Sequence, residues 1–486
     1  METVQNAPST PSSYDWRAKV ESIKKKASSL RDDRKQSEPE ELELQLYTIV
    51  NTLENLCLDV KGLKSAVRDQ DLNRLMKTVE SAVHNQTQVM RDHYKVKANF
   101  KCLRDLYIGS PEDSKEDIER ENGGLLKDSY SWILDHDDFR RFNNSPASRL
   151  LWVNGEPRTG KTMLLCGIID ELKKKPSLTL SYFFFRSTED HQEDASSALR
   201  GIIWLLCANN MALISYVREH YDNRGNKLFE GGSSFTPLAC ILKNMLQDPC
   251  LRDCIIIIDA LDECSDDTRK CLINLIVELS TSFPAKWIVS SRSSRVIKRK
   301  FRDAEGIIPL KVTKDSISQA VNFFIHHRVD EMKHSEWYDP KIKEVVLENL
   351  LLNANGSFLW VDLVCKYLKD CAPWHARKCL SETPPGVNEL YKRMLRPILI
   401  LPDGNDYQQI LAKACIKGRP LTLDELPTLV PRLKKFSQET LKEIIGNCGS
   451  FLTLTQDTTI DFLHPSARDY LMENAKDFLF PDSTKV

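Results

Sequence analysis

The chain has 486 residues, of which 41% are hydrophobic and 28% are charged. This length exceeds what one hydrophobic core normally holds, so we expect about two to four domains. The composition excludes a mostly disordered chain. The 68 basic and 69 acidic residues nearly cancel, which excludes an overall basic surface for nucleic acid or anionic membranes.

The sequence shows no membrane span, no secretory signal and no cysteine pattern typical of a zinc site. The apolar run Cys254–Ile258 is far too short to span a bilayer, so no membrane span is predicted. The first residues lack the apolar segment of a secretory signal. The 14 cysteines include a cluster without the paired spacing or the histidines of a zinc site, namely Cys250, Cys254, Cys264 and Cys271. We therefore expect reduced, mostly buried thiols and a cytoplasmic protein.

The N-terminal part is predicted to be a tail followed by helices. Residues 1–40 are polar, and residues 41–108 form a helical region that resembles a coiled coil. Its first half has apolar residues at alternating spacings of four and three, from Leu42 to Val67, which is a heptad seam. A bundle helix and a self-associating coiled coil both fit this pattern. A second helical stretch is expected from Leu72 to about Leu106, before a break at Gly109–Asp113.

Residues 109–310 are predicted to form an α/β core, a parallel sheet with helices on both faces. Short apolar runs alternate there with helix-length segments, as in parallel sheets with helical crossovers. The runs are Leu150–Asn154, Leu178–Phe185, Ile255–Asp259 and Trp287–Ser290. After about Lys311 the pattern becomes helical to the end of the chain.

A phosphate-binding (Walker A) loop follows the first of these strands. Its eight residues fit GxxxxGK[ST] and precede an apolar helix: Gly155, Glu156, Pro157, Arg158, Thr159, Gly160, Lys161 and Thr162. Glycines let backbone N–H groups point at phosphates, and the helix N-terminus adds positive charge. Lys161 would reach the β- and γ-phosphates and Thr162 would bind Mg²⁺. The loop does not distinguish ATP from GTP, and ATP/ADP is the expected nucleotide.

Two further strand ends carry polar residues toward the same edge of the sheet. Asp259 ends an apolar strand and is predicted to hold the Mg²⁺ shell. Glu263 is predicted to orient or deprotonate the attacking water, and Asp262 shares either task. Arg292 follows the strand Trp287–Ser290 and would contact the γ-phosphate. The alternative for these side chains is a solvated turn at each strand end.

These segments together resemble the NACHT class of signal-transducing P-loop NTPases, the STAND class, and in particular fungal NOD-like and heterokaryon-incompatibility proteins. The resemblance rests on GEPRTGKT, IIIIDALDE and SSR and covers roughly Cys102 to Leu471. It implies that Gly123–Leu134 packs against the base and sugar. It also implies a helical lid at 311–398, a winged-helix domain at 399–475 and a tail at 476–486. Asn355–Val361 and Leu390–Leu395 resemble the lid, and Arg419–Leu426 and Phe462–Leu471 resemble the winged helix.

The resemblance implies one more residue that contacts the nucleotide. The sequence also departs from the family pattern in three places. His464 matches the winged-helix histidine that contacts the β-phosphate of ADP in many relatives, although a histidine at a helix start can also be a cap or a core residue. Arg158 stands where relatives have a small residue, and we expect it to point to solvent or toward the phosphates. Ser293 replaces the usual proline after Arg292. Relatives continue into repeat domains, whereas this sequence ends at Val486, which suggests a shortened member, a helper or an incomplete product.

The resemblance implies a regulatory switch. ADP would hold the protein closed, exchange for ATP would open it, and the opened chains would self-associate and bring their N-terminal helices together. Slow hydrolysis through Glu263 would reset the switch. The sequence names neither the trigger nor the downstream partner. The alternatives are a turnover ATPase or phosphotransferase acting on another molecule, and a scaffold with a vestigial site. The neutral charge balance argues against nucleic acid as the partner.

Overall fold

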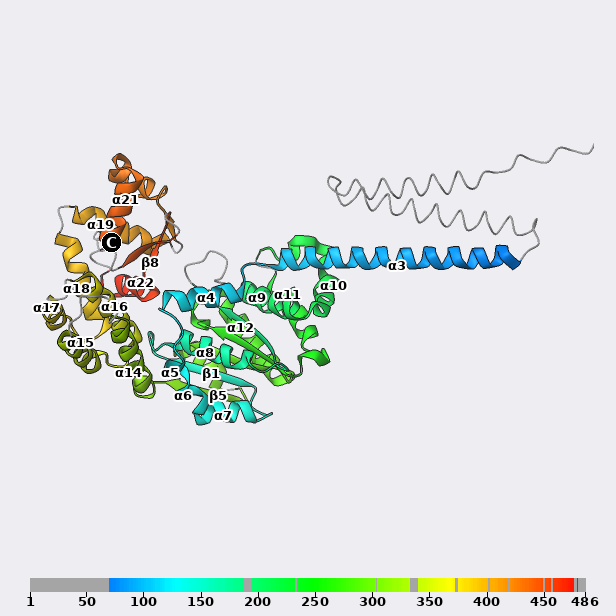
Figure 1. Cartoon of the computed structure of the whole chain (residues 1–486), viewed down its shortest axis with the longest axis horizontal. Coiled ribbons are helices and arrows are strands. Elements are labelled where there is room, and N and C mark those ends of the chain that lie inside the picture. Colours follow the sequence, from blue (N-terminus) through cyan, green and yellow to red (C-terminus); the bar gives the residue numbers. More distant parts are fainter. Residues whose placement is uncertain are drawn as a thin grey trace, which may run out of the picture. The chain divides into compact units, whose positions relative to one another are not determined.

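The computed structural model describes residues 70–186, 194–231, 234–302, 304–332, 340–371, 375–400, 403–417, 420–448, 451–455, 458–475 and 479. The chain forms two compact units, Met1–Ala98 and Asn99–Val486. The predicted tail at 1–40 and the heptad seam of Leu42–Val67 lie outside the described residues. Helix α3 (Gln70–Leu106) covers the second predicted helical stretch and ends in the second unit (Figure 1). The predicted domain boundaries stay predictions.

A five-stranded parallel sheet lies in the second unit, with the order β2-β3-β4-β1-β5. Its strands are β1 (Leu150–Gly155), β2 (Thr179–Phe184), β3 (Cys254–Asp259), β4 (Lys286–Ser291) and β5 (Ile307–Val312). The first four lie where the sequence predicts buried strands. Strand β5 is not among the predicted strands; it contains Pro309 and alternates buried with exposed residues. A proline is tolerated there because β5 is an edge strand.

Helices cover both faces of this sheet, which confirms the predicted α/β class. The first face packs against α4 (Pro111–Glu121), α5 (Lys127–Tyr130), α6 (Trp132–Asp135), α7 (Asp137–Asn144) and α8 (Lys161–Lys173). The second packs against α9 (Ala195–Asn209), α10 (Ile214–Arg224), α11 (Phe235–Met245), α12 (Asp266–Ser282) and α13 (Arg295–Arg302).

Strand β3 shows why the apolar runs had to be continuous. Ile255 and Ile257 belong to the core on the first face, and Ile256 and Ile258 to the core on the second. Successive side chains of a strand point to opposite faces, so a strand covered on both sides is apolar at every position. The end of α3 contributes as well, since Cys102 and Leu106 are fully buried on the second face.

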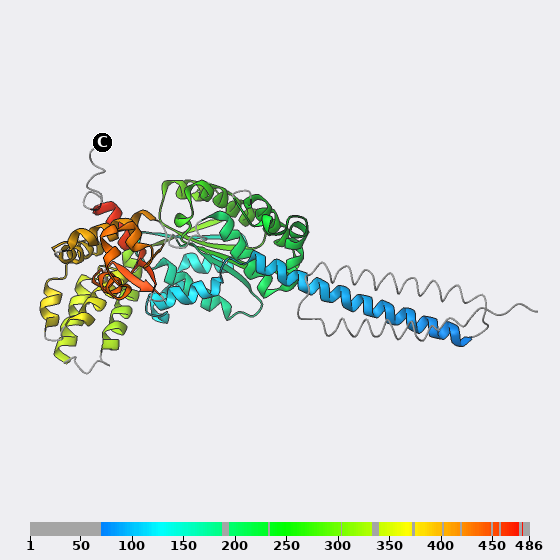
Figure 2. The same cartoon turned by 90° about the horizontal axis from the view of Figure 1, so that it is seen from above.

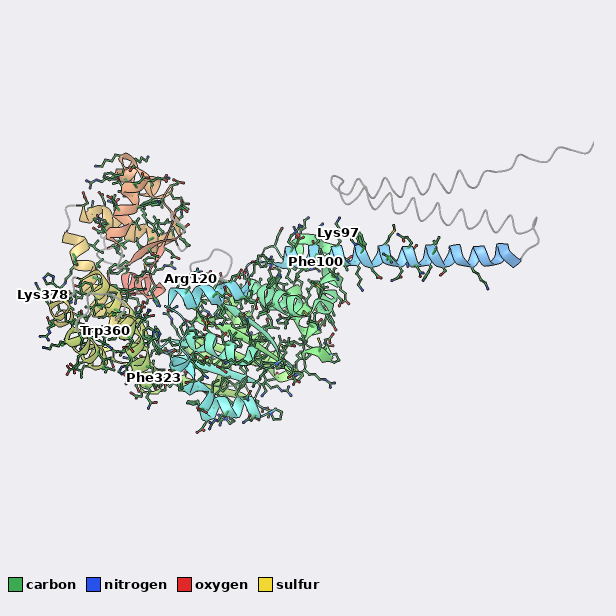
Figure 3. The ribbon with its side chains drawn as sticks, in the orientation of Figure 1. Lys97, Phe100, Arg120, Phe323, Trp360 and Lys378 are labelled. Atoms are coloured by element: carbon green, nitrogen blue, oxygen red, sulfur yellow. The ribbon has the colours of Figure 1, made fainter. Side chains whose placement is uncertain are left out.

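A helical segment follows β5 and occupies the region predicted as the lid. It consists of α14 (Lys314–Glu331), α15 (Pro340–Asn353), α16 (Phe358–Asp370), α17 (Ala376–Ser381) and α18 (Val387–Ile400). Helix α14 packs against α5, α15 and α16, so the segment rests on the core (Figure 2). Trp360 of α16 is fully buried among these helices, and its Nε1 donates to Pro384 O at 3.0 Å (Figure 3).

The C-terminal part combines helices with a small antiparallel sheet of order β6-β8-β7. Its elements are α19 (Gly404–Lys417), β6 (Leu421–Thr422), α20 (Leu426–Leu429), α21 (Gln438–Asn447), β7 (Leu452–Thr455), β8 (Thr459–Phe462) and α22 (Pro465–Asn474). Helix α22 contacts α18, α19 and β8. This is the region in which the resemblance implies a winged helix.

Two further expectations concern the whole described chain. The described cysteines form no disulfide with one another and most are buried, and no group of three or more His, Cys, Asp or Glu suited to a metal occurs in the parts of the chain that are described. Within the described segments, no helix is long and apolar enough to cross a membrane.

Candidate nucleotide-binding site

The phosphate loop connects β1 to α8 with the predicted strand–loop–helix geometry. Gly160 is the N-cap of α8 and has a left-handed backbone with φ of 73°, a conformation that favours glycine. A Cβ atom on Gly160 would lie 3.0 Å from the ring of Phe358, and one on Gly155 would lie 2.7 Å from Val312 O. The left-handed backbone therefore favours glycine at 160, and the close approach of Val312 O favours glycine at 155.

Lys161 lies over the carbonyl groups of its own loop. Its Nζ donates to Glu156 O at 2.8 Å and to Gly155 O at 3.2 Å. Burial lowers the pKa of Lys161, while the nearby carboxylates of Asp262 and Asp259 act in the opposite direction. The ammonium group thus stands where the loop, α8 and the carboxylates after β3 meet, which is the position that phosphate binding requires.

Asp259 ends β3 and is almost completely buried, with 2% of its surface exposed. Ser290 Oγ donates to Asp259 Oδ1, and Thr162 also hydrogen-bonds to this side chain. Burial raises the pKa of Asp259, and these two hydrogen bonds act against the rise. The structure therefore brings together Thr162 and Asp259, the two predicted Mg²⁺ ligands.

The donor chemistry at this point fits magnesium. A hydroxyl and a carboxylate are the hard oxygen ligands that Mg²⁺ prefers, and Mg²⁺ commonly takes only one or two protein ligands and leaves the rest to phosphate and water. Thr162 and Asp259 would hold the ion, which would neutralise charge on the phosphate oxygens.

Asp262 is engaged by Arg292. The backbone N of Arg292 donates to Asp262 Oδ1 at 2.7 Å, and the side-chain Nε lies 3.0 Å from Asp262 Oδ2. Asp262 therefore fixes the turn after β4, which makes it a positioning residue in this geometry. Glu263 lies partly buried in the 3₁₀ turn η4 (Leu261–Glu263), and its charge acts on Lys161 and Arg292. Its predicted role with water stays a prediction.

Arg292 also reaches the C-terminal part of the chain. Its Nη2 donates to Asp469 Oδ2 of α22 at 3.0 Å. Burial would lower the pKa of Arg292, but the carboxylates of Asp469 and Asp262 outweigh burial and raise it. Sequence reasoning missed Asp469, because nothing in its local pattern indicates contact with a residue so distant in the chain.

The Arg158 side chain contacts helices α18 and α22. Its Nη1 donates to Asn388 Oδ1 of α18 at 2.8 Å, and its Nη2 donates to Ser466 O of α22 at 3.3 Å. The guanidinium also lies 5.9 Å from the ring centre of Tyr391. Burial lowers the pKa of Arg158. The expectation of a solvent-facing side chain is wrong, because α18 and α22 offer it acceptors and an aromatic face. The expected place of its charge near the phosphates stays a prediction.

Replacing Arg158 by glycine is expected to loosen α22. Glycine suits the positive φ of 69° at this position, so the loop itself would not be strained, while the hydrogen bonds from the loop to α18 and α22 would be lost. We expect amide hydrogen exchange in α22 to become about tenfold faster. Exchange in α12, which Arg158 does not contact, serves as the internal control, and unchanged rates in α22 would show that Arg158 does not hold this helix.

His464 is the N-cap of α22. Its Nδ1 accepts from Ser466 N at 3.1 Å and lies 2.8 Å from Ser466 Oγ. Burial, followed by the charge of Arg158, lowers the pKa of His464 to about 4, so the imidazole is neutral at pH 7. The helix-cap alternative is thus the geometry observed. The contact of His464 with a β-phosphate stays a prediction.

The lowered pKa of His464 predicts acid sensitivity. Between about pH 6.5 and pH 4 the unfolded chain binds a proton on this residue that the folded chain does not, so stability is lost as the pH falls through this window. His464→Asn keeps a capping acceptor but does not titrate. From pH 7 to pH 5 we expect the melting temperature of the wild type to fall by a few °C more than that of the variant. Equal decreases in the two proteins would contradict the assignment. The raised pKa of Asp259 makes stability increase as the pH falls, and the comparison of wild type with variant cancels this effect because both proteins contain Asp259.

Comparisons with known proteins agree with the motifs. The family model described as Nephrocystin 3, N-terminal, matches residues 128–292, a range that contains the phosphate loop and all three strand ends. Vegetative incompatibility protein HET-E-1 of Podospora anserina is 44% identical over 384 residues, which is 77% of this chain. The chain spans only 28% of the length of that relative.

Solved structures give a weaker likeness. The Aeropyrum pernix ORC1 protein in complex with DNA is 14% identical over 72% of this chain and 96% of its own, with a TM-score of 0.33. Cdc6p from Pyrobaculum aerophilum is 12% identical over 74% of this chain and 96% of its own, with a TM-score of 0.32. TM-scores of this size do not establish a shared arrangement, and the fold rests on the strand order and the loop geometry.

Proposed function

We propose that this chain, a NACHT-type, NOD-like P-loop NTPase as the match to the fungal incompatibility protein indicates, is a nucleotide-dependent regulatory switch. One observation carries the proposal. Helix α22 of the C-terminal part contacts the phosphate site itself, through Arg158 to Ser466 O and through Arg292 to Asp469. A nucleotide that changes the partners of these arginines changes how firmly α22 is held.

The loop residues would bind ADP or ATP. The backbone of Gly155–Thr162 and the Lys161 ammonium would hold the phosphates, and Thr162 and Asp259 would hold Mg²⁺. With ADP the contacts to α22 persist and the chain is closed. With ATP the third phosphate competes for Arg292, and a ligand that binds the open state better shifts the population toward it. Hydrolysis assisted by Glu263 would return the chain to the ADP form.

Opening would act through self-association. Clustering of open chains raises the effective concentration of their N-terminal helices, so that weak helix contacts become a signal. The similarity to an incompatibility protein supports a signalling role of this kind. A protein trigger and a downstream partner are implied, and the cytoplasm is the proposed compartment.

The bound nucleotide of the purified chain tests this proposal. The protein is denatured, and any nucleotide released is identified and counted by chromatography. We expect stoichiometric ADP. A folded but empty chain that turns over added ATP rapidly would favour a working ATPase instead, and a folded chain that binds no nucleotide would favour a scaffold with a vestigial site.

A further inference from the structure

Arg292 occupies the centre of the candidate site. It follows β4, which lies between β1, the strand of the phosphate loop, and β3, the strand of Asp259. The carboxyl ends of parallel strands meet at one edge of the sheet, so Arg292 lies at the same edge as the phosphate loop and Asp259. The charges of Arg292, Asp262 and Glu263 all act on the pKa of Lys161, and Arg292 contacts Asp262 directly.

Two carboxylates form ion pairs with the Arg292 guanidinium. Asp262, on the turn after β3, lies 3.0 Å from Arg292 Nε, and Asp469, on α22, lies 3.0 Å from Arg292 Nη2. The Asp262 side chain is 14% exposed, whereas those of Asp469 and Arg292 are 33% and 39% exposed. Asp262 is therefore the fixed partner of Arg292, and Asp469 is the partner on a separate, more exposed element.

Other contacts of helix α22 position Asp469 for its ion pair with Arg292. Ser466 lies one turn before Asp469, and its carbonyl accepts from Arg158 while its hydroxyl lies 3.0 Å from Tyr391 OH. Residues three apart on a helix share one face. The same face of α22 thus presents Ser466 to the phosphate loop and Asp469 to Arg292.

We propose that Asp469 is a specificity-determining residue that makes the closed chain prefer a nucleoside diphosphate to a triphosphate. The inference rests on the proposed function and adds to it the residue that discriminates between the two ligands. A diphosphate is held by the loop and leaves the Arg292–Asp469 pair in place. A third phosphate brings further negative charge toward Arg292, close to the Asp469 carboxylate. Repulsion between the two anions opposes triphosphate binding unless the contact of Arg292 with α22 is lost.

The neutral, isosteric variant Asp469→Asn tests the inference on the full chain. Affinities for Mg–ADP and for Mg–AMP-PNP, a triphosphate that resists hydrolysis, are measured by calorimetry after removal of bound nucleotide. We expect the variant to shift the ratio of the two affinities up to about fivefold toward the triphosphate, which corresponds to the upper end of about 1 kcal/mol for a partly exposed ion pair. High salt is expected to reduce the shift. Asp469→Ser should give the same shift, and the melting temperature of each variant verifies folding.

Two comparisons make the result specific. Glu473→Gln removes an exposed carboxylate one turn further along α22, and its ratio should equal that of the wild type. Asp469→Asn combined with Arg292→Gln should lose the shift, because the competition acts through Arg292. A wild-type ratio in both Asp469 variants, an equal shift in Glu473→Gln, or a shift that persists without Arg292 would each overturn the inference while nucleotide binding stands. A folded wild type that binds neither ligand would overturn the proposed function itself.

Discussion

Lys161→Ala is expected to lose measurable nucleotide binding. Lys161 is the cation that the phosphate loop places over its own carbonyls, and its charge lies among Asp259, Asp262 and Arg292. Hydrogen bonds to charged groups contribute about 1.5–3 kcal/mol each, so loss of the contacts to two phosphates is expected to weaken affinity for Mg–ADP by about 100-fold or more. Calorimetric titration of the folded variant measures the effect.

A matched lysine on the same helix region provides the control. Lys174 follows α8 directly, its side chain is 62% exposed, and it forms an ion pair with Glu171. Lys174→Ala should bind Mg–ADP as the wild type does. If Lys161→Ala retained the wild-type affinity, the loop would not be the phosphate site, and the interpretation of Gly155–Thr162 would be wrong.

Glu263→Gln is expected to bind nucleotide normally and to lose turnover. A positioned general base contributes about 100-fold to 10,000-fold in rate, and the amide of glutamine cannot accept a proton from water. We therefore expect single-turnover phosphate release from ATP to slow by at least about 100-fold, with the affinity for Mg–ADP little changed. Asp266→Asn is the control, because Asp266 lies nearby on α12 with a side chain that is 89% exposed. Turnover at the wild-type rate in Glu263→Gln would exclude Glu263 as the base.

The local chemistry of the site could be predicted from the sequence because it depends on short-range patterns. The phosphate loop requires a strand before it and a helix after it, and both are visible in the apolar residues around Gly155–Thr162. Asp259 is recognisable for a similar reason, since a carboxylate that ends a fully apolar strand must lie at the sheet edge. The structure adds that Ser290 and Thr162 hydrogen-bond to this carboxylate.

The partners of the two arginines could not be predicted in this way. Arg158 contacts α18 and α22, and Arg292 contacts α22. Each arginine is more than 170 positions away in the chain from its partner in α22. Such contacts depend on how the C-terminal part packs, and no local spacing encodes them.

Strand β5 was not predicted for a different reason. Pro309 and the alternation of buried and exposed residues resemble an irregular segment.

The strand order also bears on how this protein is made. Strand β1 pairs with β4 and β5 and with neither β2 nor β3, although β2 and β3 leave the ribosome first. At about 5–20 residues per second, the fully buried β1 waits on the order of ten seconds before β4 is synthesised. During that interval its two edges are unpaired, a state that invites aggregation. Synthesis of this chain therefore passes through a stage in which the phosphate loop exists without its sheet, and chaperone binding to the nascent core is the expected protection.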